Sequence, residues 1–161
     1  MKQRETELAG IEGNIDSAQS DADYYAAEIQ AQEEIIAEIR RIEAEKAAAG
    51  KQDNHYTGGV FTWPCPSSTR VTSDYGTRVS PMGGASSNHK GIDIGASGGA
   101  AIVAAADGTV TTAAYSSAAG NYVMIDHGGG LYTVYMHASA LLVSPGQTVS
   151  AGQTIAQVGS T

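Results

Sequence analysis

Two histidines and one aspartate with the chemistry of metal binding and proton transfer lie in two short segments. His89 and Asp93 are four positions apart within residues 88–95, and His137 ends the later segment 135–137. Imidazole and carboxylate groups are the ligands of hydrolytic zinc sites, which need three protein ligands and one open position. The sequence therefore offers His89 and Asp93 as candidate Zn²⁺ ligands and His137 as a candidate catalytic group.

The spacing of His89 and Asp93 requires a bend if both are to bind one ion. In an extended strand the two residues would lie about 13 Å apart, at ~3.3 Å per residue. A helix would bring them within about 6 Å, but Gly91 and Gly95 make a helix unfavourable. We expect the backbone to bend between them, with Gly91 as the residue best able to do so.

The remaining histidines and the cysteine are weaker candidates. Cys65 is the one cysteine, which excludes an intrachain disulfide and a cysteine-based metal site, and we expect it to be a small buried side chain. His55 lies in a polar, glycine-containing stretch that is typical of a solvated linker. Neither residue is expected to supply a third ligand.

Most of the negative charge lies in the first third of the chain. Residues 1–50 hold twelve acidic and five basic residues, whereas residues 51–161 hold five acidic and four basic residues, so no basic patch exists and nucleic acid is an unsuitable partner.

We expect residues 1–49 to form a coiled-coil helical arm that serves as a spacer or docking element. Its partner would be a second copy or an antiparallel helix. A coiled coil is expected because mostly small and apolar residues recur at alternating spacings of three and four. These residues are Leu8, Ile11, Ile15, Ala18, Ala22, Tyr25, Ile29, Gln32, Ile36 and Ile39.

After a linker at residues 50–60, in which Gly50 is expected to end the helix, the pattern changes to short alternating segments. Glycine, serine and proline separate these segments, and no helical stretch of ten residues occurs among them. We therefore predict that residues 61–161 form a mainly β domain with an antiparallel sandwich or barrel-like fold. The expected strands are 101–105, 108–115, 122–126, 132–137 and 154–158.

Residues 61–161 resemble the lysostaphin-like zinc metallopeptidases that cut peptidoglycan crosslinks. The resemblance rests on motifs that occur in the same order and at similar spacing. They are Asp-Tyr-Gly-Thr-Arg at 74–78, Asn-His-Lys-Gly-Ile-Asp-Ile at 88–94, Ile-Val-Ala-Ala-Ala-Asp-Gly at 102–108, Ile-Asp-His-Gly at 125–128, Tyr-Met-His at 135–137 and the glycine-punctuated run 146–161. A preceding coiled-coil arm is also typical of envelope members of this family.

The resemblance implies a role for each candidate residue. His89 and Asp93 correspond to zinc ligands, and His137 to a catalytic histidine that stabilises the tetrahedral intermediate. His127 corresponds to a structural position. The family also has a His-x-His pair on a later strand, which supplies the third ligand and is absent from these 161 residues. We expect that the chain ends before this pair, and that the chain as given is therefore inactive.

The function implied is that of a zinc-dependent endopeptidase acting on the stem peptides or cross-bridges of bacterial peptidoglycan. The substrate places it outside the cell or in the cell envelope, although no signal peptide is visible and no apolar run reaches the ~18 residues needed to span a membrane. A non-catalytic envelope factor that binds and activates a cell-wall hydrolase is the alternative. A biotinyl or lipoyl carrier domain fits less well, because Lys90 is the one lysine after residue 51 and lies within the His/Asp motif.

Overall fold

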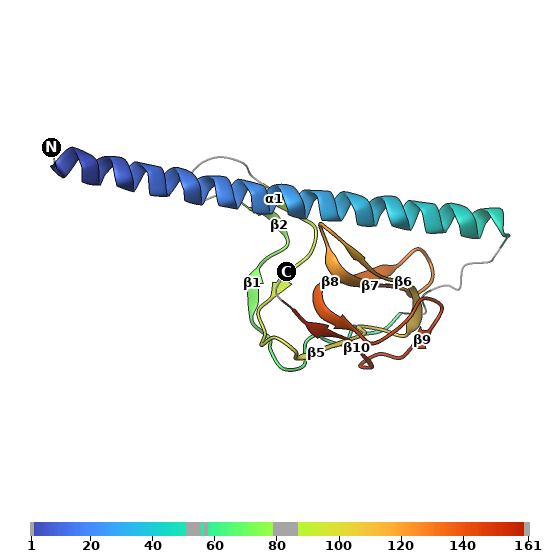
Figure 1. Ribbon diagram of the computed structural model, residues 1–161. Coiled ribbons are helices and arrows are strands. Elements are labelled where there is room, and N and C mark those ends of the chain that lie inside the picture. The colour runs from blue at the N-terminus through green and yellow to red at the C-terminus, as the bar shows by residue number, and fades with distance from the viewer. Residues whose placement is uncertain (1, 51–55, 57, 79–86, 160–161) are drawn as a thin grey trace.

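The computed structural model describes residues 2–50, 56, 58–78 and 87–159, in which one long helix precedes a β-rich region (Figure 1). Helix α1 spans Lys2–Ala48. Ion pairs one turn apart, from Arg41 to Glu38 and to Glu45, support its second half. The helix ends as predicted at Gly50, whose φ of 62° is the left-handed conformation that commonly follows the last helical turn.

The main sheet has six strands in the order β5-β10-β8-β7-β6-β9, and every pairing within it is antiparallel. This arrangement confirms the predicted antiparallel, mainly β fold, and the five predicted strands are all present. β9 was not predicted, and β8 continues four residues beyond its predicted end. The strands are β5 (Ala101–Val103), β6 (Gly108–Ser116), β7 (Gly120–Asp126), β8 (Tyr132–Leu141), β9 (Thr148–Val149) and β10 (Thr154–Val158).

The hydrophobic core lies against the curled main sheet. Its largest fully buried side chains come from four of the six strands, so burial of apolar surface joins strands that are distant in sequence. These side chains are Met124, Ile125, Ile155, Val110, Val123 and Val149.

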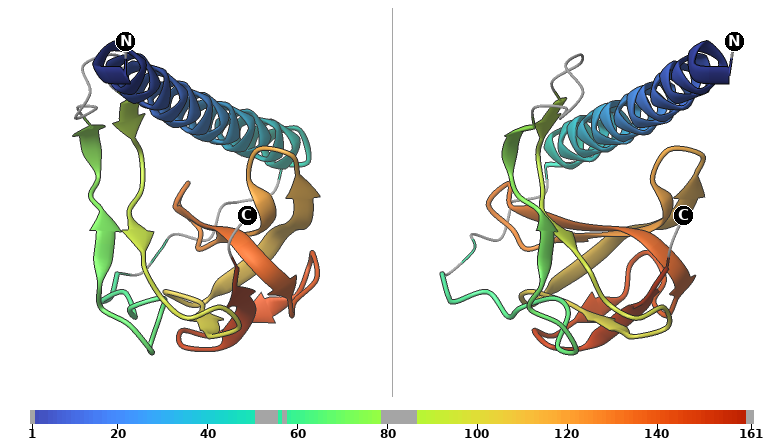
Figure 2. Two further views of the ribbon diagram at one scale, coloured as in Figure 1. Left: turned by 60° about the vertical axis from the view of Figure 1, so that its left-hand side comes forward. Right: turned by 90° about the vertical axis from the view of Figure 1, so that its left-hand side faces the viewer.

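Four short strands beside the main sheet form two further antiparallel pairs. β1 (Val71–Ser73) pairs with β4 (Asp93–Ile94), and β2 (Gly76–Arg78) pairs with β3 (Ser87–His89). Because β1 continues into β2 and β3 into β4, the two pairs form one bent ribbon, whose β2–β3 end stands close to α1 (Figure 2). The sequence did not predict these strands, which are only two or three residues long.

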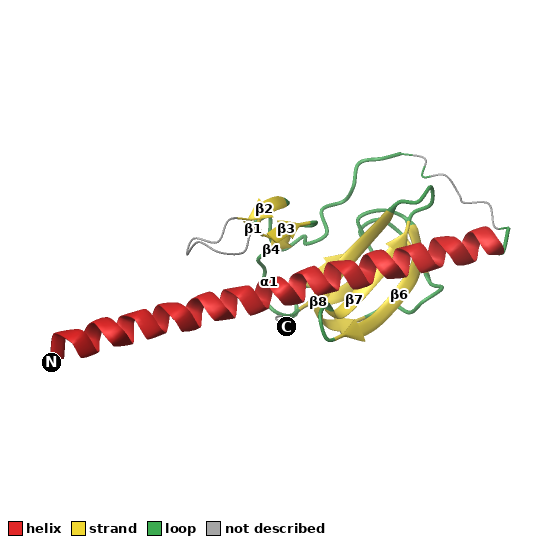
Figure 3. Ribbon diagram, turned by 90° about the horizontal axis from the view of Figure 1, so that it is seen from above, coloured by secondary structure: helices red, strands yellow, loops and turns green. Residues whose placement is uncertain are grey.

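The second half of α1 packs across the β-rich region, over β8, β7 and β6 (Figure 3). Ala31 is 0% and Ile35 is 8% exposed on the packed face, whereas Leu8 and Ile15 in the first half are 58% and 61% exposed. The fully packed positions Ala31 and Ile35 thus lie outside the predicted coiled-coil stripe, and a separate helical partner remains a prediction.

Ion pairs and hydrogen bonds fix the end of α1 to the sheet. Lys46 Nζ lies 2.6 Å from Asp126 Oδ2 and donates to Tyr132 Oη at 2.9 Å, and Tyr132 also contacts Glu43. Burial alone would lower the pKa of Lys46, but its hydrogen bonds to Asp126, Tyr132 and Glu43 raise it overall. Within the described part of the chain, no helix has the length and apolarity needed to cross a bilayer.

Candidate metal and catalytic site

His89 is held at the end of β3 with one ring nitrogen already in use. It pairs with Gly76 of β2 and is 4% exposed. Its Nδ1 lies 3.0 Å from the backbone oxygen of Asp74, which can only accept a hydrogen bond. Nδ1 therefore carries the proton in this contact, and Nε2 is left to bind a cation, as in many metal-ligating histidines.

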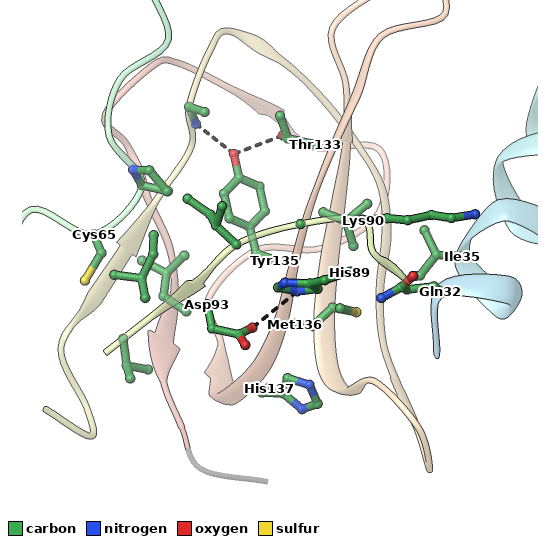
Figure 4. Close-up of a pocket in the computed structure, with 18 of the residues that line it drawn as sticks. Gln32, Ile35, Cys65, His89, Lys90, Asp93, Thr133, Tyr135, Met136 and His137 are labelled. Carbon is green, nitrogen blue, oxygen red and sulfur yellow. Dashed lines mark hydrogen bonds and ion pairs between the residues drawn. The ribbon is translucent and has the colours of Figure 1, made fainter. Parts of the chain in front are cut away.

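Asp93 begins β4 and brings its carboxylate to this nitrogen. Its Oδ1 lies 3.5 Å from Nε2 of His89, and its side chain is 38% exposed (Figure 4). The predicted bend is present, because the chain leaves β3 after His89 and bends at residues 90–91 before β4 begins. Gly91 has no left-handed φ, and a Cβ there would be in ordinary contact, 3.7 Å from His89 Nε2. The bend therefore does not require a glycine, contrary to the expectation from sequence.

His137 is presented by an irregular point in β8. Its φ of 58° is the one left-handed value among the described non-glycine residues. The register of β8 against β7 shifts between the pairs Asn121–Ala138 and Val123–Tyr135, so β8 carries an extra residue there. Bulges of this kind re-aim side chains and are frequent beside active sites.

The three candidate residues line one pocket of about 840 Å³ between α1 and the β-rich region (Figure 4). One wall comes from β8 and from the segment that carries His89 and Asp93, and another from Gln32 and Ile35 of α1. Tyr135 of β8 also lines the pocket, where burial raises the pKa of its hydroxyl and its oxygen accepts from the backbone N–H of Ala105. The structure thus brings His137 to the same pocket as His89 and Asp93, although it lies 44 residues after Asp93 in the sequence.

A further residue of the site, Glu28, was missed by the sequence reasoning. Its Oε1 lies 3.2 Å from Nε2 of His89, and the residue is 8% exposed. Gln32, one turn later in α1, donates to the same oxygen at 3.1 Å. Glu28 is one of twelve acidic residues in the first fifty, and no local signal in the sequence distinguishes it from the others.

The other sequence candidates lie apart from this arrangement. His127 is buried, with Nδ1 2.7 Å from the Asp107 oxygen and Nε2 2.7 Å from Thr133 Oγ1, so both of its nitrogens are used within the fold. Cys65 lines the pocket but is buried, as expected, beside Ser67. His55 lies outside the described residues.

The chemistry around His89 fits a metal ion. Asp93 Oδ1 faces Nε2 of His89 at 3.5 Å, and a cation placed between these two acceptors would satisfy both. This separation is also close to the distance of about 3.3 Å between two ligands of a tetrahedral zinc ion. Among the described residues, no group of three or more His, Cys, Asp or Glu side chains is arranged to hold a metal. His89 and Asp93 therefore remain two candidate ligands.

Comparison with known proteins connects this site to a family. The model for peptidase family M23 matches residues 87–161, which include all three candidate residues. The chain is 40% identical over 93 residues to the peptidoglycan DD-endopeptidase ShyC of Vibrio cholerae, a match covering 57% of this chain and 22% of ShyC. It is 37% identical over 103 residues to the murein hydrolase activator NlpD of Escherichia coli, covering 63% of this chain and 25% of NlpD. The chain thus spans about a quarter of the length of these relatives.

A similar fold is found in a crystal structure of a zinc-containing peptidase from Vibrio cholerae. The TM-score is 0.58 at 33% sequence identity, and the match covers 64% of this chain and 33% of the other. The relatives therefore include an endopeptidase, a zinc-containing peptidase and an activator of murein hydrolases.

Proposed function

The chain belongs to peptidase family M23, and on this basis we propose that it is a zinc-dependent endopeptidase that hydrolyses peptide crosslinks of bacterial peptidoglycan. The observation that carries the proposal is the placement of His89. One of its nitrogens is tied to the Asp74 carbonyl, and the other faces Asp93 Oδ1 at 3.5 Å, in a pocket that also contains His137. The similarity to the endopeptidase ShyC over 93 residues also supports the proposal.

In this proposal His89 and Asp93 hold the metal through Nε2 and the carboxylate. The contact from Nδ1 of His89 to the Asp74 carbonyl fixes the ring orientation and directs Nε2 toward the pocket. The chemistry that zinc supplies when bound is Lewis-acid activation of a peptide carbonyl and of water. The Asp93 carboxylate would also offset part of the charge of the ion beside the buried His89 ring.

His137 has a different role, because it enters the pocket from β8 rather than from the bent ribbon that carries the ligands. An imidazole at this place can donate a hydrogen bond to the oxyanion that develops on the scissile carbonyl, and can transfer a proton to the leaving amine. The left-handed backbone of His137 sets the direction in which its side chain leaves β8.

Peptidoglycan as substrate implies a location in the cell envelope or outside the cell. The relatives named for peptidoglycan or murein support this proposal, since each matches more than half of the chain. The proposed partners are accordingly the stem peptides or cross-bridges of the wall, and the first half of α1 remains available to a helical partner.

The test is digestion of isolated peptidoglycan, with zinc and with a chelator, followed by mass spectrometry of the released fragments. It uses a longer chain that also carries the His-x-His pair of the family, because the 161 residues alone are expected to be inactive. We expect zinc-dependent loss of crosslinked fragments with that longer chain. His89→Ala should reduce it by more than about 100-fold, beyond the effect usual for residues that only support ligands. His55→Ala is the matched control and should cleave like the unsubstituted chain. Equal cleavage by the His89→Ala chain would contradict the proposal.

A second function is favoured by one specific observation. Among the described residues no group of three side chains is arranged to hold a metal, and the chain is also similar to the activator NlpD. A non-catalytic factor that stimulates a separate wall hydrolase would give no cleavage alone, but would increase cleavage when that hydrolase is added. In that case substitution of His89 should leave the stimulation unchanged.

A further inference from the structure

The left-handed backbone of His137 is held by hydrogen bonds that come from outside β8. Its φ of 58° is unfavourable for a residue with a Cβ, so the contacts around it must maintain it. The backbone N–H of His137 donates to the carbonyl oxygen of Ala119 at 3.0 Å, and the side-chain amide of Asn121 donates to the carbonyl oxygen of Ala138 at 2.9 Å. The segment that joins β6 to β7 therefore binds the β8 backbone on both sides of the His137 Cα.

This segment, the 116–121 turn, is itself fixed by its own contacts. The Ser116 hydroxyl accepts a hydrogen bond from the backbone N–H of Ala119 at 3.0 Å, and Ala119 is 1% exposed. Gly120 has a left-handed φ of 63°, which lets the chain reverse into β7 at little steric cost. The turn can thus act as a rigid support for the irregular part of β8.

Asn121 holds β8 through a side chain, and the chemistry of the contact requires an amide. A backbone carbonyl can only accept a hydrogen bond, so the nitrogen of the Asn121 amide must face Ala138. Aspartate has almost the same shape but, when ionised, has no donor, and it would place an acceptor against an acceptor. The residue type at position 121 therefore decides whether the support can form.

The opposite edge of β8 is bounded by the end of β10, in agreement with the strand order β10-β8-β7. A Cβ at Gly159 would lie 2.6 Å from the backbone oxygen of His137, and the Ser139 hydroxyl donates to the Val158 oxygen at 2.9 Å. The bulge is therefore enclosed on two sides. Its backbone sets the direction of the His137 imidazole, which is among the groups that line the pocket (Figure 4).

We propose that Asn121 is a positioning residue of the proposed active site, whose amide holds the β8 bulge so that His137 keeps its left-handed backbone and its place in the pocket. This inference rests on the proposed function, because it concerns the histidine that would stabilise the oxyanion. Asn121 acts through the backbone of Ala138 and contacts no reacting atom. Ser116 supports the same arrangement less directly, since its hydroxyl orders the turn.

The experiment is NMR spectroscopy of the isotope-labelled, metal-free chain of 161 residues. The coupling between the amide proton and the α proton of His137 depends on φ, and it separates a left-handed backbone from an extended one. It is measured in the unsubstituted chain, in Asn121→Asp and in Ser116→Ala. Because it reports one residue, a general loss of stability does not move it.

Thr111→Val is the matched control. The Thr111 hydroxyl also donates from the β6–β7 pair to a backbone oxygen, that of Met124, at 3.2 Å, but this contact does not reach β8. Valine removes the hydroxyl and keeps the branched shape. Denaturant unfolding followed by the fluorescence of Trp63 establishes that each variant is folded before its couplings are compared.

We expect the His137 coupling to move from the left-handed to the extended value in Asn121→Asp, and to keep its original value in Thr111→Val. Ser116→Ala should move it in the same direction by less, and it decides the question if Asn121→Asp does not fold. In the longer chain that carries the His-x-His pair, Asn121→Asp should lower kcat by about 10-fold or more with KM unchanged, because a misplaced group slows the reaction step and not substrate binding.

An unchanged His137 coupling in folded Asn121→Asp would overturn the proposal, as would an equal change in Thr111→Val, which indicates a merely structural effect. The coupling is measured without zinc or peptidoglycan, so its outcome is independent of the proposed function. If the coupling moves but the longer chain cleaves no peptidoglycan, the placement of His137 by Asn121 stands and the endopeptidase assignment fails. If the longer chain cleaves and Asn121→Asp retains both coupling and kcat, the positioning role is refuted and the endopeptidase stands.

Discussion

Replacing Gly159 with alanine should destabilise the β-rich region and disturb the backbone that holds His137. A Cβ at residue 159 would lie 2.6 Å from the backbone oxygen of His137, 2.6 Å from the backbone nitrogen of Ser139 and 2.8 Å from the carbonyl carbon of Ala138. All three atoms belong to the main chain of β8 and cannot rotate away, so β8 and the strand end must separate.

The size of the effect follows from two opposing contributions. Overpacking of this kind costs about 1–3 kcal/mol. Replacing glycine with alanine also restricts the unfolded chain, which returns about 0.4–1 kcal/mol where the backbone conformation is compatible. We therefore expect the free energy of unfolding to fall by roughly 1–2 kcal/mol for Gly159→Ala.

The assay is denaturant unfolding followed by the fluorescence of Trp63, the one tryptophan, which lies in the β-rich region and donates a hydrogen bond to the Ser68 oxygen at 2.7 Å. Gly98→Ala is the matched control, because a Cβ there meets no atom within 4 Å and the backbone is not left-handed. If Gly159→Ala unfolds at the same denaturant concentration as Gly98→Ala, the close approach of residue 159 to β8 is wrong.

Two further predictions concern hydrogen bonds made by the hydroxyl groups of Tyr135 and Tyr132. Tyr135→Phe should lower the free energy of unfolding by about 1–3 kcal/mol in the same assay, because it leaves the buried N–H of Ala105 without its acceptor, and an unchanged midpoint would contradict this. The hydrogen bond that the Tyr132 hydroxyl donates to Glu43 should be lost in alkali. Burial and the hydrogen bond to Glu43 raise the pKa of Tyr132 from 10.0 to about 12, so this contribution is fully present below about pH 10 and is lost as the pH rises through the folded value. Unfolding midpoints from about pH 9 to about pH 12 should therefore fall more steeply than those of a Tyr132→Phe chain.

The sequence predicted most of the main sheet because its strands have clear boundaries. β6, β7 and β10 follow alternating or apolar runs that end at glycine-containing turns. Strands β1 to β4 of the bent ribbon were not predicted, because each has only two or three residues and shows no visible periodicity in the sequence. Their pairing depends on contacts between β1 and β4 that are separated by about twenty residues of chain.

The site could be predicted only as far as its residues belong to motifs. His89, Asp93 and His137 were identified from residue type and spacing, and the structure places them around one pocket. The contact of Glu28 with His89 depends on how α1 lies on the sheet, which a heptad pattern does not determine. That pattern is equally compatible with packing against another helix, and the positions that face the sheet include Ala31 and Ile35, which lie outside the predicted stripe.

The proposed metal site is tested most directly by a zinc titration of the purified chain, using equilibrium dialysis and elemental analysis. The variants His89→Ala, Asp93→Ala and His55→Ala are titrated in parallel. We expect one zinc ion per chain at saturation for the unsubstituted protein and for His55→Ala. His89→Ala and Asp93→Ala should each weaken binding by at least about 100-fold, because each removes one of two ligands. Zinc binding by His89→Ala with unchanged affinity would show that the metal lies elsewhere and would contradict the proposed mechanism.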